Sequence, residues 1–187
     1  NGRQISTYSD FVDDLLAIDI SKRQLIAAEK FSKSIGVNAR FELCSDASEL
    51  GYEDESFDLI ICTRVLQHLY DWKKAVRGFQ RLLKPGGDLV LITYNRFSLY
   101  GIIKLLEHKL IDPLKGDIRN PIGLLRELKR SNFSVDYYAG GLIGQPVLFP
   151  KRFFKLGENL LYFMETLDKK KLFKYIGERQ IVRARKI

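Results

Sequence analysis

Two short apolar runs constrain the fold of this chain most strongly. Residues 57–62 (FDLIIC) and 88–93 (DLVLIT) have the length of strands, are rich in Ile, Leu and Val, and lead into polar residues. Such runs are typical of strands buried in a parallel sheet. Between them, residues 72–83 have the composition of a helix, and residues 84–87 (KPGG) stop it. The sequence therefore predicts a strand–helix–strand unit.

The same alternation of strands and helices extends along the rest of the chain. Before the first run we expect strands at residues 15–19 and 41–44, and a helix from Ser21 to about Ser34 that ends at Gly36. After the second run we expect helices at 99–110, 122–130 and 153–167, strands at 133–138 and 180–184, and a turn at Gly140, Gly141 and Gly144. This order predicts the α/β class, with a doubly wound, mostly parallel sheet and right-handed crossovers.

Length and composition restrict the class of protein. A chain of 187 residues is expected to form a single domain, 1–187, with a sizeable core. No apolar run approaches the roughly 20 residues that a membrane-spanning helix needs, and no signal peptide is visible. Cys44 and Cys62 lie in strand-like runs without metal-ligand spacing, so we expect buried, reduced thiols, a cytoplasmic location and no metal site.

The positive charge is concentrated toward the carboxyl end. Residues 1–94 carry 12 Lys and Arg against 14 Asp and Glu, whereas residues 151–187 carry 11 against 4, within a formal net charge of +8. A basic region favours an anionic partner such as a phosphate, an acidic lipid head group or nucleic acid. The alternative is an ordinary solvated basic surface.

Two acidic residues follow predicted strands. Asp19 ends one strand, 17 positions after Gly2, and an acid at this place accepts hydrogen bonds from ribose hydroxyls in nucleotide-binding sheets. Asp46 follows the next strand and precedes Ala47. The alternative for both carboxylates is the capping of a helix or turn.

These residues, together with the segments at 57–69 and 82–93, resemble the class I methyltransferases that depend on S-adenosylmethionine (SAM). The resemblance covers residues 1–94 well and implies a seven-stranded sheet whose last strand is antiparallel. It makes 1–94 the cofactor-binding half and 95–187 the substrate-side half, with a helical insertion at about 140–176. It implies SAM as cofactor, S-adenosylhomocysteine as product and the following cofactor-binding residues: Gly2, Asp19, Ile20, Asp46, Ala47, Thr63 and Arg64.

In this resemblance Gly2 is the final glycine of the family's glycine-rich loop, and the first strand and the earlier glycines are missing from the chain. Because that strand is central, its absence would leave two apolar edges unpaired. We therefore expect the natural protein to begin some tens of residues before Asn1, and this 187-residue form to bind the cofactor weakly or not at all. Dimerisation through the open edge is the alternative.

The implied reaction is displacement of the SAM methyl group by a substrate atom held in line with it. A base is needed only for a protonated nucleophile, and His68 and Tyr94 are the candidates. Because residues 95–176 combine apolar and basic side chains, we expect an anionic small-molecule or lipid-like acceptor, with peripheral membrane contact as an option. The alternatives are a non-catalytic domain that binds an anionic partner, an RNA methyltransferase, and a nicotinamide-dependent enzyme.

Overall fold

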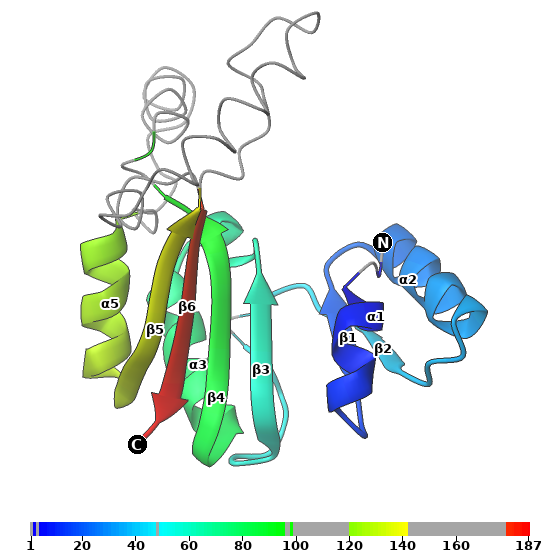
Figure 1. The fold of residues 1–187 in the computed structure, drawn as a ribbon, viewed down its shortest axis with the longest axis horizontal. Coiled ribbons are helices and arrows are strands. Elements are labelled where there is room, and N and C mark those ends of the chain that lie inside the picture. The colour runs from blue at the N-terminus through cyan, green and yellow to red at the C-terminus, as the bar shows by residue number, and fades with distance from the viewer. Residues whose placement is uncertain (1, 3, 48, 96–97, 99–119, 142–178) are drawn as a thin grey trace, which may run out of the picture. The chain divides into compact units, whose positions relative to one another are not determined.

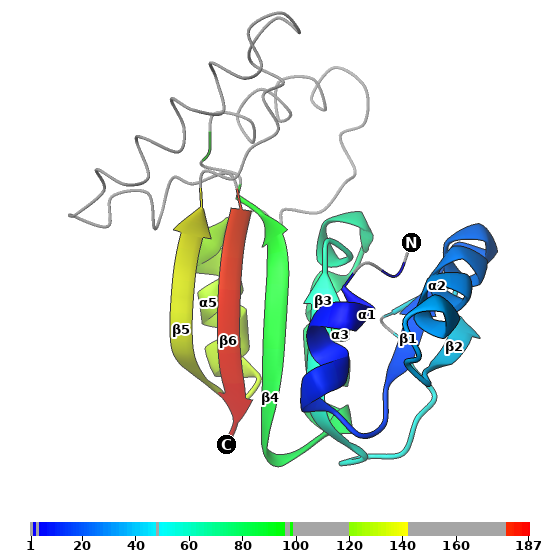
Figure 2. The same cartoon turned by 45° about the vertical axis from the view of Figure 1, so that its right-hand side comes forward.

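The computed structural model describes residues 2, 4–47, 49–95, 98, 120–141 and 179–187. The chain divides into two compact units, Asn1–Leu50 and Gly51–Ile187 (Figures 1 and 2). Each unit is built around a sheet of its own, one of two strands and one of four.

The first unit is a βαβ arrangement preceded by a short helical segment. Strands β1 (Leu16–Asp19) and β2 (Arg40–Leu43) are parallel, and α2 (Lys22–Ser34) connects them. Before them lie α1 (Ile5–Tyr8) and a 3-10 helix (Ser9–Phe11).

Helix α2 begins where the sequence predicts. The Ser21 hydroxyl accepts a hydrogen bond from the Gln24 amide at 3.3 Å, which satisfies a free donor of the first turn. The helix buries Leu25 and Ala28. Its apolar side chains therefore provide the core of this small unit.

The second unit is a four-stranded sheet in the order β3-β4-β6-β5. Its strands are β3 (Phe57–Thr63), β4 (Leu83–Tyr94), β5 (Phe133–Gly141) and β6 (Arg179–Lys186). Strands β3 and β4 are parallel, whereas β6 is antiparallel to both β4 and β5. The predicted mostly parallel α/β sheet with an antiparallel last strand is confirmed.

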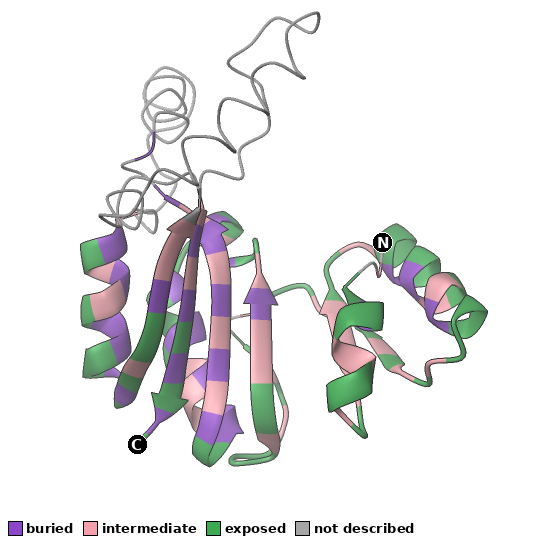
Figure 3. Ribbon diagram, viewed as in Figure 1, coloured by how far each residue is buried: buried purple, intermediate pink, exposed green. Residues whose placement is uncertain are grey.

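Helices α3 (Trp72–Leu82) and α5 (Pro121–Arg130) lie against the same face of this sheet (Figure 1). Burial alternates along β4 and β6 (Figure 3). This is the pattern expected of strands, in which successive side chains point to opposite faces of the sheet. The side chains that form this core are fully buried: Leu66, Val76, Leu82, Leu89, Leu91, Leu124, Leu128, Phe133 and Val182.

Several element boundaries differ from the sequence-based predictions. Gly140 and Gly141 lie inside β5 and not in a turn, because they pair with Gln180 and Arg179 of β6. The Lys84–Gly87 segment is counted within β4, although its pairing with β3 is interrupted by a register shift between Phe57 and Leu59. The helix α1 was not predicted from its polar sequence.

The predicted helices at 99–110 and 153–167 and the insertion at about 140–176 lie outside the described residues, apart from 140 and 141. The single-domain organisation of 1–187 and its two functional halves stay predictions. Across the described residues, no helix has both the length and the apolar character needed to cross a membrane.

Candidate functional site

Asp19 and Asp46 both lie at the carboxyl edge of the β1–β2 sheet. Asp19 is the last residue of β1 and lies opposite Leu43, the last residue of β2. The Cys44 amide then donates to the Asp19 carbonyl oxygen at 3.1 Å, and Asp46 follows two residues later. Both carboxylates therefore come from the carboxyl edge of a parallel sheet, where α/β folds bind ligands.

Asp19 has a structural role as well as an exposed carboxylate. Its Oδ1 accepts a hydrogen bond from the Ser21 amide at 2.8 Å, directly before α2. Among the described residues, Oδ2 has no partner, and the residue is exposed to solvent. Capping therefore uses only one oxygen. The neighbouring Ile20 presents an apolar side chain that is 72% exposed.

Asp46 begins a tight turn. Its carbonyl oxygen accepts hydrogen bonds from the Glu49 amide at 3.1 Å and from the Cys44 thiol at 3.3 Å. The residue is exposed, and Ala47 beside it is half-buried. The turn fixes the backbone at the same edge at which Asp19 lies.

Gly2 lies against α2 in a conformation that favours glycine. Its φ is +71°, and a Cβ atom there would stand 2.7 Å from the Cα of Ala28. Only a residue without a side chain allows this approach of the backbone to the helix. Gly2 therefore has the properties expected of a glycine in a tight turn before a nucleotide-binding helix.

In the second unit, two unusual features lie at the carboxyl end of β3. The Thr63 hydroxyl oxygen is buried and, among the described residues, lacks a hydrogen-bond partner. Arg64 has a φ of 55°, which is uncommon for a residue with a side chain, and its amide donates to the Ile92 carbonyl oxygen at 2.7 Å. An unpaired buried hydroxyl and backbone strain are both typical of ligand sites.

A short polar network next to this strand end was not predicted from the sequence. The Thr93 hydroxyl donates to Oε1 of Gln67 at 3.2 Å, and Nε2 of Gln67 lies 3.4 Å from Nε2 of His68. Gln67 thus joins the Thr93 hydroxyl to the ring of His68. Gln67 is buried and His68 is exposed. The sequence could not predict this network, because Gln67 and Thr93 are 26 positions apart and only the fold brings them together.

Tyr94, the other candidate base, ends β4 and is half-buried. Its carbonyl oxygen accepts a hydrogen bond from Nε2 of Gln180 at 3.1 Å, and the Tyr138 hydroxyl donates to Oε1 of Gln180 at 3.4 Å. This network holds the backbone at the carboxyl end of β4 and involves the main chain of Tyr94. A catalytic role for either candidate base stays a prediction.

The two cysteines differ in their surroundings. Cys62 is buried, and burial raises the pKa of its thiol to about 12. Cys44 is only partly buried, so the expectation of two buried thiols holds for Cys62 and is wrong for Cys44. Cys44 is more exposed because it lies beyond the end of β2. Within the described ranges, no group of three or more His, Cys, Asp or Glu is placed to hold a metal ion.

The predicted cofactor residues thus divide between the two units. The first unit contains Gly2, Asp19, Ile20, Asp46 and Ala47, and the second contains Thr63, Arg64, His68 and Tyr94.

The amino-terminal half of the chain resembles a known protein family. Residues 1–91 match the family described as "Methyltransferase domain". The match covers just under half of the chain and supports a class I SAM-dependent methyltransferase.

Curated relatives match only part of this chain. An uncharacterized methyltransferase, YcgJ, of Bacillus subtilis is 33% identical over 94 residues, which is 50% of this chain and 37% of the relative. A ubiquinone biosynthesis O-methyltransferase of Paraburkholderia phymatum is 34% identical over 83 residues, which is 44% of this chain and 36% of the relative. The sequence matches therefore span little more than a third of the length of these relatives.

Solved structures show the same fold over nearly the whole chain. The crystal structure of YcgJ from Bacillus subtilis superimposes with a TM-score of 0.66 and 19% identity, covering 99% of this chain and 87% of the other. The [4+2]-cyclase SpnF gives a TM-score of 0.65 and 19% identity, covering 99% and 70%. The fold is thus shared with a protein described as a cyclase, so the fold alone does not determine the activity.

Proposed function

We propose that the protein transfers the methyl group of SAM to an acceptor, and that the first unit binds the nucleoside part of the cofactor. The observation that carries this proposal is the placement of Asp19 and Asp46 at one carboxyl edge of a parallel sheet. The family match over residues 1–91 supports SAM as the cofactor.

Each residue of the first unit would have a separate task. Oδ2 of Asp19 is available to accept hydrogen bonds from ribose hydroxyls, while Oδ1 stays on the Ser21 amide. Asp46 would accept from the exocyclic amine of adenine, and the amide of Ala47 would donate to a ring nitrogen. The exposed Ile20 would cover an apolar face of the nucleoside. Gly2 keeps the preceding turn free of side-chain atoms.

Thr63 and Arg64 would hold the methionine part of the cofactor. The buried Thr63 hydroxyl lacks a partner among the described residues, so it fits a polar ligand group that would satisfy it. The backbone at Arg64 has an uncommon conformation, and such conformations persist where the surrounding structure holds them in place, often at ligand sites. These two observations are in agreement with a cofactor that carries polar groups at this strand end.

SAM supplies an already activated methyl group, so the protein has mainly to orient the acceptor and exclude water. A base is required only where the acceptor atom carries a proton. We propose His68 and Tyr94 as candidates.

For the acceptor we propose an anionic small molecule or lipid-like compound. The support is the composition of residues 151–187, which contain 11 Lys and Arg but only 4 Asp and Glu. Large apolar residues are interleaved with these cations along the segment. We also propose a cytoplasmic location, because Cys44 and Cys62 are both free thiols and free thiols are typical of a reducing compartment. RNA is the competing acceptor class.

The proposal is tested by titrating S-adenosylhomocysteine into the complete gene product by calorimetry, with NAD in a parallel titration. Saturable binding of S-adenosylhomocysteine without binding of NAD is expected. Binding of NAD alone would replace the methyltransferase proposal by a nicotinamide-dependent one. Transfer of radiolabelled methyl groups to small anionic compounds or to RNA then assigns the acceptor class. Methylation of RNA, with binding that weakens steeply as salt rises, would overturn the proposed acceptor.

A further inference from the structure

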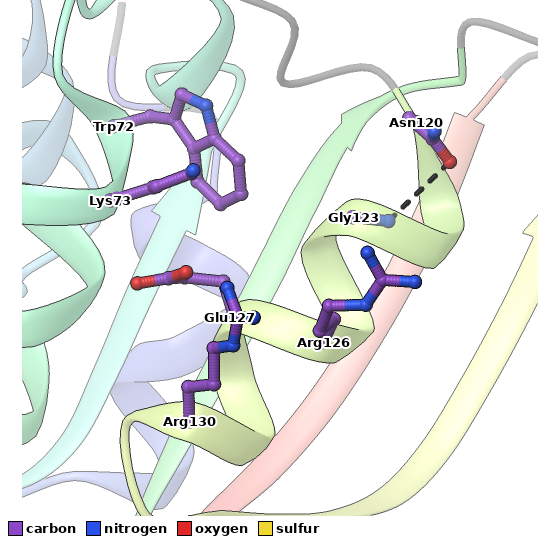
Figure 4. Close-up of a pocket in the computed structure, with 7 residues that line it drawn as sticks. All are labelled: Trp72, Lys73, Asn120, Gly123, Arg126, Glu127 and Arg130. Carbon is purple, nitrogen blue, oxygen red and sulfur yellow. Dashed lines mark hydrogen bonds between the residues drawn. The ribbon is translucent and has the colours of Figure 1, made fainter.

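An open groove lies between the two helices that cover the sheet of the second unit. It has a volume of about 270 Å³ and is lined by Trp72 and Lys73 of α3 and by Asn120, Gly123, Arg126, Glu127 and Arg130 at α5 (Figure 4). None of these residues belongs to the proposed cofactor site. The four α5 residues are spaced as neighbours along one face of the helix.

The lining of the groove is strongly cationic. Lys73, Arg126 and Arg130 contribute three positive charges, and Glu127 contributes the single carboxylate. Throughout the part of the chain that the structure describes, no carboxylate lies within 4.0 Å of these three cations. This part of the helical layer therefore has charge that an anionic ligand would balance.

Glu127 does not neutralise the groove, because it is paired with another residue. Its Oε1 lies 3.3 Å from Nη1 of Arg77, and its side chain is only 8% exposed. Arg77 is on α3, outside the lining of the groove. This ion pair joins the two helices, so among the described residues the three groove cations have no carboxylate partner.

The groove also has an aromatic wall. Trp72 is buried to 6% exposure, and Nζ of Lys73 lies 5.9 Å from the centroid of its ring. Figure 4 shows the indole and the Lys73 ammonium at the end of the groove opposite the Arg126 guanidinium. A ligand with a small apolar part next to its charge would thus contact both kinds of surface.

From this arrangement we propose that the groove between α3 and α5 binds a phosphomonoester. A phosphomonoester carries about −1.5 to −2 charges at neutral pH and has three strong acceptor oxygens, whereas a carboxylate carries one charge and two oxygens. Two guanidinium groups and one ammonium group match the phosphate better, because guanidinium donates paired hydrogen bonds to its oxygens. The source of the phosphate is a soluble metabolite or a lipid head group.

Trp72 makes the test direct, because it is the only tryptophan of the 187-residue chain. Phenyl phosphate is titrated into the protein while the fluorescence of Trp72 is followed, with phenol as the uncharged counterpart. A saturable change with phenyl phosphate and none with phenol is expected. Co-sedimentation with vesicles containing phosphatidic acid, against vesicles of phosphatidylcholine alone, distinguishes a lipid head group from a soluble phosphate.

Variants connect the binding to the groove. The double change Arg126→Ala and Arg130→Ala removes two charged donors and should weaken binding by at least about tenfold. Lys129→Ala is the matched control, because Lys129 lies on the same helix, is exposed and does not line the groove. It should change the affinity by less than about twofold, as expected for an exposed charge outside the site.

Circular dichroism confirms that each variant keeps its helices, so a loss of binding is not a loss of fold. Binding in either the soluble or the vesicle arm that depends on Arg126 and Arg130 supports the proposal. An equal loss in Lys129→Ala would show a diffuse basic surface and overturn it. Absence of saturable binding in both arms would overturn it as well. These outcomes are independent of S-adenosylhomocysteine binding.

Discussion

The Ser21 amide donates a hydrogen bond to Oδ1 of Asp19 at 2.8 Å, so the proposed ribose ligand also shapes the start of α2. Ser21 is itself the N-cap of that helix, and its hydroxyl accepts from the Gln24 amide. One carboxylate thus contributes to folding through Oδ1 and remains available to a ligand through Oδ2. A substitution at Asp19 must therefore be chosen so that the two effects can be separated.

Asp19→Ala should weaken binding of S-adenosylhomocysteine by roughly ten- to a hundredfold, which corresponds to loss of a charged acceptor worth about 1.5–3 kcal/mol. Asp19→Asn keeps an oxygen for the Ser21 amide but loses the charge, so it should preserve folding and still bind more weakly. Calorimetry of both variants in the complete gene product measures the effect. Equal affinity of Asp19→Ala and the natural protein would remove Asp19 from the site.

Gly2 and Gly36 form a matched pair for testing the glycine turn. Both have a φ of +71°, but a Cβ at Gly2 would stand 2.7 Å from the Cα of Ala28, whereas a Cβ at Gly36 would meet nothing within 4 Å. Gly36→Ala should therefore cost only the backbone strain, about 1–2 kcal/mol. Gly2→Ala should cost more, because the added methyl group forces the helix to shift. The extra cost is a typical overpacking energy of about 1–3 kcal/mol.

Hydrogen–deuterium exchange of the α2 amides measures this difference. Exchange should be faster in Gly2→Ala than in Gly36→Ala, and both should exceed the natural protein. If the two variants exchange at the same rate, the close approach of Gly2 to Ala28 does not contribute to stability.

The strands of this fold were predictable because apolar runs and strand ends are local features. Residues 57–62 and 88–93 became β3 and β4, and the acid that follows an apolar run, Asp19, lies at the end of a parallel strand as expected. The sequence also indicated the start of α2 from Ser21. Such features depend on the local sequence, so they can be predicted without knowing which distant residues pack against them.

The features that were missed depend on distant parts of the chain. Gly140 and Gly141 resemble a turn, but pairing with β6 across about 40 residues keeps them in a strand. The contact between Gln67 and Thr93 joins residues 26 positions apart. The α3–α5 groove combines Lys73 with Arg126 and Arg130, which only packing on one sheet face brings together. The charge counts point to residues 151–187, whereas the three groove cations lie outside that range.

Asp88 should make unit stability depend on pH. Burial alone would raise the pKa of its carboxyl, but hydrogen bonds from Arg183 at 2.8 Å and Arg185 at 3.2 Å hold the pKa below the ordinary 3.8. A depressed pKa in the folded state adds stability that is fully present above the ordinary value and is lost as pH falls through the folded one. The ion pairs therefore stabilise the sheet at neutral pH and fail in acid.

Asp88→Asn should lower the free energy of unfolding by roughly 1 kcal/mol at pH 7, the upper range for partly exposed ion pairs. The difference from the natural protein should shrink at pH 2.5. Urea denaturation followed by Trp72 fluorescence reports on this unit at both pH values. Asp58→Asn is the control, since Asp58 is 81% exposed in its pair with Lys84 and should matter less. An Asp88→Asn effect of equal size at both pH values would contradict the assignment.

The two thiols should react at very different rates. Burial raises the pKa of Cys62 to about 12, so at pH 8 almost none of it is thiolate, the form that reacts. Cys44 is only partly buried, and its thiol lies 3.3 Å from the Asp46 carbonyl oxygen at the proposed adenine edge.

Titration with a thiol-reactive chromogenic disulfide should give one fast-reacting thiol and a second thiol that reacts only on unfolding in urea. Cys44→Ser should abolish the fast phase, and S-adenosylhomocysteine should slow it in the complete gene product, because the ligand would cover Asp46. Two fast thiols in the folded protein would show that Cys62 is accessible and that β3 is not packed as described.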